Sequence, residues 1–246
     1  MRYHGLLLAA GKGTRLASKA EGIPKAVVKV GEETLVEQNL GRLAELGLEH
    51  IVVVVGYMAE VVIDHLADNP HREKVEFVRQ EEALGTGHAV AISRGALHDE
   101  PFVLCYCDNF TPYRLPPLLE VHEDQHNTVT FALFRAEDPS RHGIMQVEGD
   151  RIVNIVERPT EPVGNLAFAG MGVFESDIYD AVENVRRSES GEYYLTDAVM
   201  DLVRAGKPVG FDVLSCMRVN INSPAELERA WNYVLAHPTA ANPPDA

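Results

Sequence analysis

Hydrophobic residues in the first half of the chain follow two alternating patterns. Short apolar runs at residues 6–10, 51–55 and 102–107, with an alternating segment at 75–78, are typical of strands in a sheet covered on its faces. Apolar residues recur at helical spacing in the intervening segments 35–46, 58–66 and 88–97. This order predicts an α/β fold, in which helices flank a Rossmann-like, mostly parallel sheet and ligands bind at the carboxyl ends of its strands.

The second half is richer in strands. Strand-like patterns cover residues 128–134, 144–147, 152–156 and 167–174, and helical patterns cover residues 178–185, 198–205 and 224–235. Ser223 and Pro224 are the residue types expected at the start of the last helix. We expect one domain over residues 1–236, with an α/β half to about residue 110, a β-rich half over about 111–236, and a flexible, proline-containing tail at 237–246.

Composition narrows the possible partners. The 246 residues include 22 lysines and arginines against 37 aspartates and glutamates, a formal net charge of −15. Such a surface repels polyanions, which argues against nucleic-acid and anionic-membrane partners but not against a small phosphorylated ligand in a local pocket. The sequence shows no run of about 18 apolar residues, no signal peptide and no disulfide framework among three cysteines. We therefore expect a cytoplasmic protein.

A glycine-containing loop follows the first predicted strand. It reads Leu8-Ala9-Ala10-Gly11-Lys12-Gly13-Thr14-Arg15-Leu16. Backbone N–H groups of such a loop can approach phosphate oxygens, and Arg15 and Lys25 would add positive charge. The dinucleotide fingerprint requires a third glycine where Leu16 stands, and the P-loop motif is absent. On spacing alone, a phosphate loop and a plain strand-to-loop turn both remain open.

Several segments together resemble the sugar-1-phosphate nucleotidyltransferases. They are residues 8–16, Ile23-Pro24-Lys25, Val55-Gly56-Tyr57 with Glu60, Gln80 with residues 84–89, Cys107-Asp108-Asn109, His142-Gly143 with residues 155–159, residues 191–197, and residues 219–227. The matches occur in the family's order over about residues 6–231. Two positions depart from the family's pattern: Arg158 replaces the usual lysine, and Cys107 replaces the usual glycine.

The resemblance implies that a nucleoside triphosphate and a sugar 1-phosphate react to give a nucleoside diphosphate sugar and pyrophosphate, with Mg²⁺ as cofactor. The implied catalytic residues are Arg15, Lys25 and Asp108. The implied nucleotide-binding residues are Leu8, Ala9, Ala10, Gly11, Gly13, Thr14, Gln80, Leu84, Gly85 and Thr86. The implied acceptor-binding residues are Asn109, Gly143, Glu157, Arg158 and Asn222. Asp108 is expected to bind the metal together with Asn222, or with Asn220 as the second choice.

Other functions stay open at this level. A cytidylyltransferase acting on phosphocholine, a phosphonate or another non-sugar phosphate would share the fold and the glycine loop, and a cyclitol phosphate could replace the sugar phosphate. A catalytically silent, nucleotide-binding regulator would not need Asp108. A dinucleotide-dependent oxidoreductase is disfavoured by Leu16 and by Gly56 and Tyr57 after the second strand. UTP or dTTP is expected before CTP or GTP, and a homo-oligomer is possible.

Overall fold

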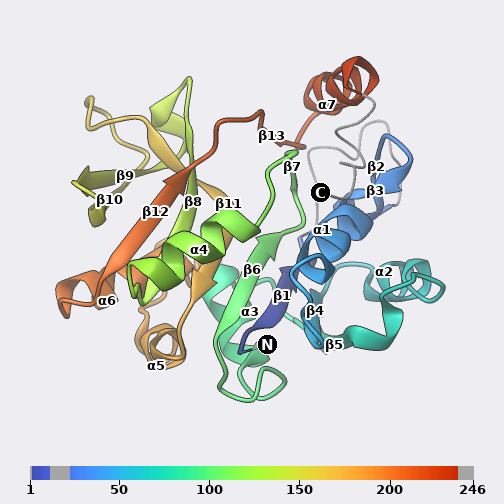
Figure 1. Ribbon diagram of the computed structural model, residues 1–246, viewed down its shortest axis with the longest axis horizontal. Coiled ribbons are helices and arrows are strands. Elements are labelled where there is room, and N and C mark those ends of the chain that lie inside the picture. The colour runs from blue at the N-terminus through green and yellow to red at the C-terminus, as the bar shows by residue number, and fades with distance from the viewer. Residues whose placement is uncertain (1, 12–22, 238–246) are drawn as a thin grey trace.

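A computed structural model describes residues 2–11 and 23–237 of the chain. Within these residues, a nine-stranded sheet has the order β5-β4-β1-β6-β11-β8-β12-β10-β9 (Figure 1). The strands are β1 (His4–Leu8), β4 (Ile51–Val55), β5 (Val75–Arg79), β6 (Phe102–Tyr106), β8 (Val129–Arg135), β9 (Gly143–Glu148), β10 (Arg151–Glu157), β11 (Leu166–Phe174) and β12 (Val209–Val213). The predicted tail falls almost wholly outside the described residues.

The sheet has a parallel part and a mixed part. β5, β4, β1 and β6 run parallel to one another. β11 is antiparallel to both β6 and β8, β8 and β12 form another parallel pair, and the β9–β10 hairpin packs antiparallel beside β12. The predicted α/β fold with a strand-rich second half is confirmed, and the pairing of β6 with β11 joins the two halves into one sheet.

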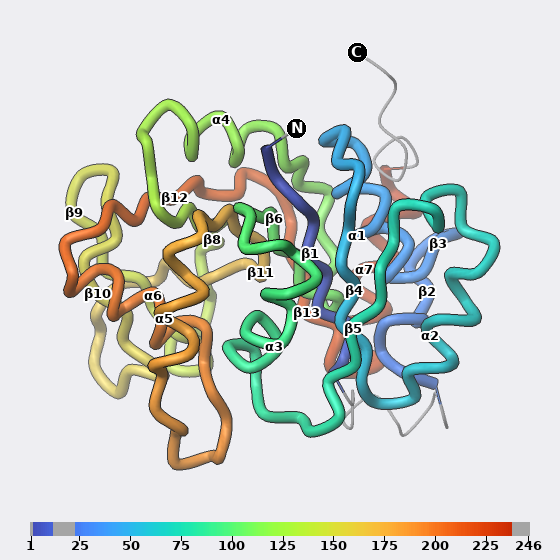
Figure 2. The backbone as a smooth tube through the Cα atoms, turned by 90° about the horizontal axis from the view of Figure 1, so that it is seen from below, coloured from blue at the N-terminus to red at the C-terminus, as the bar shows by residue number. Residues whose placement is uncertain are grey.

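Helices cover both faces of the sheet. They are α1 (Leu35–Ala44), α2 (Ala59–His65), α3 (Thr86–Ser93), α4 (Pro116–Asp124), α5 (Asp177–Asn184), α6 (Leu195–Arg204) and α7 (Pro224–Ala236), with 3₁₀ turns at Lys25–Val27, Arg72–Lys74 and Pro139–Arg141. Figure 2 shows α4 above the sheet and α3 and α5 below it. Consecutive strand residues face opposite sides, so Leu7 packs in one hydrophobic cluster and Leu6 in the other. The continuous apolar runs of β1 and β4 follow from this two-sided burial.

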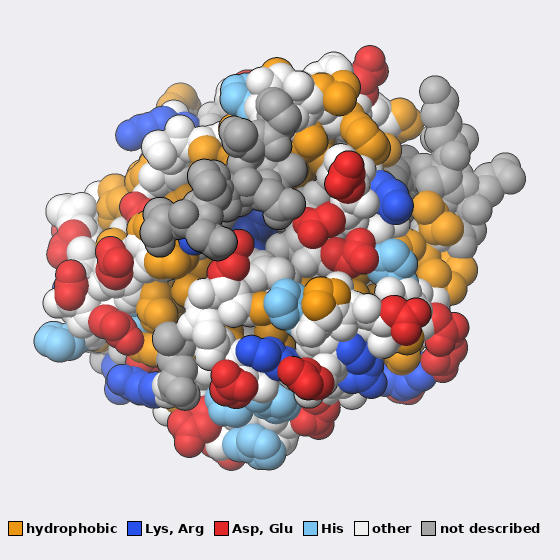
Figure 3. Space-filling view, turned by 45° about the vertical axis from the view of Figure 1, so that its right-hand side comes forward, with side chains coloured by type: hydrophobic (Ala, Val, Ile, Leu, Met, Phe, Trp, Pro, Cys, Tyr) orange, Lys and Arg blue, Asp and Glu red, His pale blue; other side chains and the backbone are white. Residues whose placement is uncertain are grey.

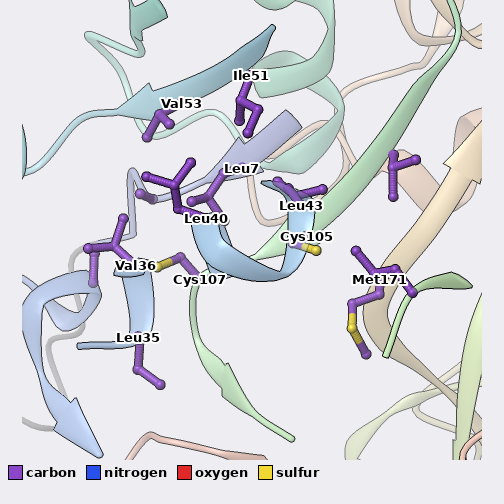
Figure 4. Close-up of a cluster of buried hydrophobic side chains, with 14 of the residues drawn as sticks. Leu7, Leu35, Val36, Leu40, Leu43, Ile51, Val53, Cys105, Cys107 and Met171 are labelled. Atoms are coloured by element: carbon purple, nitrogen blue, oxygen red, sulfur yellow. The ribbon is translucent and has the colours of Figure 1, made fainter. Parts of the chain in front are cut away.

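Helix α1 shows how local sequence and packing agree. Thr34 caps the helix, because its side chain accepts a hydrogen bond from the Glu37 backbone while the Glu37 carboxylate accepts from the Thr34 backbone. The apolar face of α1 packs on β1, β4 and β6 (Figure 4). Cys105 and Cys107 lie in the same cluster, and burial raises the pKa of the Cys105 thiol to about 12. Packing therefore accounts for both cysteines.

Some elements differ from the predicted ones. Helix α3 begins at Thr86, two residues before the expected start, and ends at Ser93, four residues before the expected end. It begins early because Gly85 adopts a left-handed φ of 93° and its carbonyl accepts from the Ala89 N–H. Helix α4 and strand β12 were not predicted. Pro116 and Pro117 obscure α4 in the sequence, although proline is well tolerated in a first helical turn.

Two short sheets complete the fold. β7 (Asn109–Phe110) pairs with β13 (Val219–Asn220), and β2 (Lys29–Val30) pairs with β3 (Glu33–Thr34). No helix in residues 2–11 and 23–237 is long and apolar enough to span a bilayer. Acidic side chains are spread over the face of the molecule seen in Figure 3, as the net charge leads one to expect.

Candidate functional site

The candidate site forms where the end of β6 meets a segment from the far end of the chain. Asp108 lies two residues after the end of β6, and the Ile221 N–H donates to the Asp108 carbonyl oxygen at 2.9 Å. β7 and β13 pair so that Asn109 lies opposite Asn220 (Figure 1). Ser223 caps the following helix α7 through the Glu226 N–H, as predicted. These backbone contacts bring Asn220 and Asn222 beside Asp108, although Asn220 is 112 positions away in the sequence.

Lys25 lies at the centre of this group. Its Nζ atom donates to Asn222 Oδ1 at 2.8 Å and to Asn220 Oδ1 at 2.9 Å, and lies 3.5 Å from Asp108 Oδ2. The Lys25 side chain is only 7% exposed, whereas that of Asp108 is 38% exposed. Burial lowers the pKa of Lys25, and the nearby Asp108 carboxylate opposes this shift. We call Lys25, Asp108, Asn220 and Asn222 the Lys25 cluster.

The Lys25 cluster presents oxygen atoms of the kind that hard divalent cations prefer. The cluster supplies three possible metal ligands: one carboxylate oxygen and two amide oxygens, all directed at the Lys25 ammonium group. No group of three or more His, Cys, Asp or Glu side chains in residues 2–11 and 23–237 is arranged to hold a metal ion. A cation held by one or two carboxylates together with substrate phosphates, as is usual for Mg²⁺, fits this donor set.

Asn109 holds the Asp108 carboxylate through a side-chain hydrogen bond. The Asn109 side chain is buried, and its Nδ2 atom donates to Asp108 Oδ1 at 2.6 Å. Gly170 allows this packing, because a Cβ at that position would lie 2.5 Å from Asn109 Nδ2. Gly170 also adopts a left-handed φ of 84°. In the structure, therefore, Asn109 contacts the predicted metal ligand; its predicted contact with the acceptor stays a prediction.

A first cavity of about 400 Å³ opens on one side of the Lys25 cluster, with Lys25 and Asp108 in its wall. Many predicted nucleotide-binding residues line it: Leu8, Ala9, Ala10, Gly11, Gln80, Gly85 and Thr86. Gly56 permits the close approach of two walls, since a Cβ there would lie 3.1 Å from both the Ala10 and the Gln80 carbonyl oxygens. Gly13, Thr14 and Arg15 lie outside the described residues.

Backbone hydrogen bonds from Tyr193, which is distant in sequence, hold the loop before α3 in place. Tyr193 donates through its N–H to the Leu84 carbonyl and accepts from the Gly87 N–H, both at 2.8 Å. A Cβ at Gly85 would lie 2.6 Å from the Tyr193 carbonyl oxygen. Gln80 Nε2 donates to the Gly85 carbonyl at 3.0 Å. Leu84 does not line the cavity, and its contact is this backbone bond to Tyr193.

Sequence reasoning missed several residues of this first cavity. Ala83, Tyr106, Glu192 and Tyr194 also line it. Glu192 and Tyr194 belong to the segment 191–197, which matches the family but suggested no site role. Tyr106 ends β6, so its place at the carboxyl end of a parallel strand was the available signal.

A second cavity, of about 790 Å³, opens on the other side of the Lys25 cluster. Asn220 and Asn222 line it, as does the predicted acceptor residue Arg158. Its other walls come mainly from residues 134–142 and 214–219. The predicted acceptor residues Gly143 and Glu157 do not line it; they face each other across the β9–β10 hairpin, and a Cβ at Gly143 would lie 2.7 Å from Glu157 Oε2. The Lys25 cluster thus separates two cavities large enough for two substrates.

The chain matches the family model described as "Nucleotidyl transferase" over residues 4–219. It is 31% identical over 240 residues to the UTP–glucose-1-phosphate uridylyltransferase AglF of Haloferax volcanii, covering 96% of this chain and 98% of AglF. It is 31% identical over 235 residues to the bifunctional protein GlmU of Methanococcus aeolicus, covering 94% of this chain but only 54% of GlmU.

A solved structure shares the fold. A UDP-glucose pyrophosphorylase complexed with UDP-glucose superimposes with a TM-score of 0.87 at 21% identity, covering 96% of this chain and 99% of that one. The family model spans most of the chain, and the relatives at about 31% identity extend over nearly all of it. The resemblance read from the sequence motifs is confirmed. The chain belongs to the nucleotidyl transferase family.

Proposed function

We propose that this chain transfers a nucleoside monophosphate from a nucleoside triphosphate to a sugar 1-phosphate. The observation that carries the proposal is the position of the Lys25 cluster between two cavities, each with part of the cluster in its wall. The triphosphate would occupy the first cavity and the acceptor the second. The name of AglF supports UTP as the nucleotide and a sugar 1-phosphate as the acceptor. The sequence motifs leave dTTP as the next choice.

The reaction requires no covalent enzyme intermediate. An oxygen of the acceptor phosphate attacks the α-phosphorus, a new P–O bond forms, and the bond from the α-phosphorus to the bridging oxygen breaks so that pyrophosphate leaves. The acceptor phosphate is already ionised at neutral pH, so no general base is needed. Catalysis then depends on positioning the two phosphates and neutralising their charge.

The residues of the chain have distinct tasks in this scheme. Lys25 places a buried positive charge beside the reacting phosphates, where low exposure strengthens its effect. Asp108, with Asn220 and Asn222, would hold Mg²⁺, which supplies charge neutralisation of the phosphate oxygens when bound. The backbone near Gly11, together with Arg15, would contact the triphosphate. Asn109 keeps the Asp108 carboxylate in position.

Pyrophosphate release in the presence of Mg²⁺ tests this proposal. Five nucleoside triphosphates would be crossed with several sugar 1-phosphates, a cyclitol phosphate, phosphocholine and an aminoalkylphosphonate. We expect turnover with UTP or dTTP and a sugar 1-phosphate. Turnover only with phosphocholine or the phosphonate would move the acceptor to the non-sugar class. Nucleotide binding without turnover on any acceptor would favour a regulatory relative.

Other expectations stay predictions. The acidic composition continues to argue against a nucleic-acid partner. A cytoplasmic location and a possible homo-oligomer rest on the sequence alone. Neither of the two relatives described above has a name that points to phosphocholine or to a regulatory role.

A further inference from the structure

The second cavity is unusually basic for so acidic a chain. Five arginines and three carboxylates line it: Arg135, Arg141, Arg158, Arg218 and Arg229, with Glu137, Asp138 and Glu226. The chain as a whole has a formal net charge of −15. Positive charge is therefore concentrated at this cavity, which favours anionic ligands there.

The carboxylates of the cavity already have partners. Glu226 accepts from the Asn222 N–H at 2.8 Å and from the Ser223 hydroxyl at 3.0 Å. Asp138 accepts from the Ser140 hydroxyl at 2.6 Å. Glu137 lies 3.7 Å from Arg229. Hydrogen bonds from neutral groups leave these carboxylates charged, so the five arginines exceed the three carboxylates of the cavity wall by two charges.

Arg135, Arg141 and Arg218 have no ion-pair partner among residues 2–11 and 23–237, whereas Arg158 lies 3.6 Å from Glu157. Arg218 is the most constrained of the three. Its guanidinium carbon lies 4.3 Å from the centre of the Phe134 ring, and its Nε atom is buried without a hydrogen-bond partner in the described residues. A buried, unpaired donor on a charged group is costly unless a ligand satisfies it.

Burial lowers the pKa of Arg218 to about 10, and Asp108 and Glu226 oppose the shift. The guanidinium therefore stays charged at neutral pH. Arg218 precedes Asn220 by two positions in the same cavity wall. The exposed Arg141 lines the same cavity, and the charges of Arg218 and Arg141 both lower the pKa of His142 in its wall. An acceptor whose attacking phosphate lies at the Lys25 cluster would contact this wall with the rest of the molecule.

One phosphate at the Lys25 cluster does not account for the arginines farther along this wall. We propose that the acceptor carries a second anionic group, a carboxylate or another phosphate, and that Arg218 with Arg141 binds it. This inference rests on the proposed nucleotidyl transfer and assigns the substrate class of the same site. Guanidinium groups suit both anions, because they donate two parallel hydrogen bonds to either.

Three acceptors that differ only at carbon 6 of the sugar test this assignment. Glucose 1-phosphate has a hydroxyl there, glucuronic acid 1-phosphate a carboxylate, and glucose 1,6-bisphosphate a phosphate. With UTP and Mg²⁺, we expect kcat/KM for pyrophosphate release to be at least about 10-fold higher for one of the two anionic acceptors, a difference of about 1.4 kcal/mol. The preferred one identifies the anion. Turnover at equal or higher efficiency with glucose 1-phosphate would overturn the inference while leaving the proposed function intact.

The Arg218→Gln variant locates the preference. We expect it to abolish the advantage of the anionic acceptor, mainly through KM, so that the loss on the anionic acceptor is at least about 10-fold larger than the loss on glucose 1-phosphate. An equal loss on all acceptors would instead place Arg218 at the attacking phosphate and contradict the inference. Arg204→Gln, an exposed arginine on α6 outside both cavities, is the matched control and should change nothing.

Two further measurements keep the test decisive. If Arg218→Gln fails to fold, the exposed Arg141→Gln variant should reduce the same preference several-fold. If no acceptor supports turnover, the proposed function fails, but calorimetric titration with the three acceptors still decides the inference. Tighter binding of an anionic acceptor that is lost in the arginine variant supports it, and equal binding of all three contradicts it.

Discussion

The two cavities beside the Lys25 cluster are built from different parts of the protein. The first is walled largely by small residues and backbone at the ends of β1 and β6 and in the loop before α3. The second is walled mainly by side chains from the end of β8 and the loop after it, from residues 214–219, and from α7, and these include five arginines. A site made of backbone at strand ends depends on the fold, whereas a site made of loop side chains depends on which residues the loops carry.

The two departures from the family's pattern fall one at each cavity. Cys107 lines the first cavity and also packs into the core. Arg158 replaces the usual lysine at the second cavity, where Arg218 has no ion-pair partner among residues 2–11 and 23–237. We infer that the arginines of the second cavity determine the choice of acceptor.

The largest effect is expected at the cluster that the two cavities share. Asp108→Ala should lower kcat by about 10³-fold, because the cluster loses its carboxylate and the metal its charged ligand. Pyrophosphate release measured across Mg²⁺ concentrations checks this, with Asp201→Ala on the exposed surface of α6 as the control. Activity near wild type with unchanged Mg²⁺ dependence would contradict the metal assignment.

Lys25→Ala should lower kcat by about 10²–10³-fold on every acceptor, since it removes a charge that stabilises the transition state. Single-turnover kinetics separate this from binding, and Lys207→Ala, whose lysine pairs with Asp177 away from both cavities, is the control. If only the KM for the triphosphate rises while kcat is preserved, Lys25 is a binding residue that serves the first cavity alone.

Gly85→Ala should damage the first cavity alone. The new Cβ would lie 2.6 Å from the Tyr193 carbonyl oxygen on a backbone with φ of 93°, so the nucleotide loop must shift. We expect a loss of about 1–3 kcal/mol in stability and a roughly 10-fold rise in KM for the triphosphate.

Gly149→Ala is the matched control for this variant. Gly149 also has a positive φ, of 59°, but its added Cβ meets no atom within 4 Å and it lies in the β9–β10 turn. It should lose stability without changing either KM. Thermal unfolding measures the stability of each variant, and steady-state kinetics measure the two KM values. An altered acceptor preference in Gly85→Ala would show that the two cavities do not act independently.

Arg158→Lys, which restores the family's usual residue, should change kcat/KM for the acceptor by less than about threefold. The Arg158 side chain is 73% exposed and lies 3.6 Å from Glu157, and exposed ion pairs contribute little. The KM for the triphosphate should stay constant. A change larger than tenfold would place Arg158, rather than Arg218, at the centre of acceptor recognition.

His142 lines the second cavity, and its pKa responds to the positive charge there. Burial lowers its pKa, and the charges of Arg218 and Arg141 lower it further. A histidine held neutral in the folded state contributes stability that is present above the ordinary pKa of about 6.5 and is lost as the pH falls through it toward the lowered value.

Nuclear magnetic resonance titration of the His142 ring measures this pKa. Arg218→Gln should raise it, and an anionic acceptor bound in the second cavity should also raise it. An unchanged pKa in the Arg218→Gln variant would mean that the arginine field does not reach His142, and would weaken the contrast between the two cavities.

The fold was largely predictable because its signals are local. The runs at β1 and β4 are apolar throughout since both faces of the sheet are covered, and each helix at helical spacing buries one face. Asp108 was predictable from its place after β6, where ligands of parallel sheets bind. Helix α4 escaped prediction because its prolines hide a pattern that its packing partners stabilise.

Contacts between distant segments were not predictable in this way. The order of motifs suggested that Asn220 and Asn222 serve the metal site, but not that both amide oxygens meet Lys25. The backbone hydrogen bonds of Tyr193 with Leu84 and Gly87 likewise join segments far apart in sequence. No periodicity within one element encodes which loops meet.

By itself, the amino-acid sequence determined the alternation of strands and helices, the acidic surface and the family to which the chain belongs. Only the tertiary structure decided that Lys25, in the wall of the first cavity, hydrogen-bonds Asn220 and Asn222 in the wall of the second, and that Arg218 lines the second without an ion-pair partner among the described residues. The physical reason is that the burial of a strand or helix face follows from the spacing of apolar residues along the chain. Electrostatic and hydrogen-bond partnership arises only when β7 pairs with β13 and distant loops pack together.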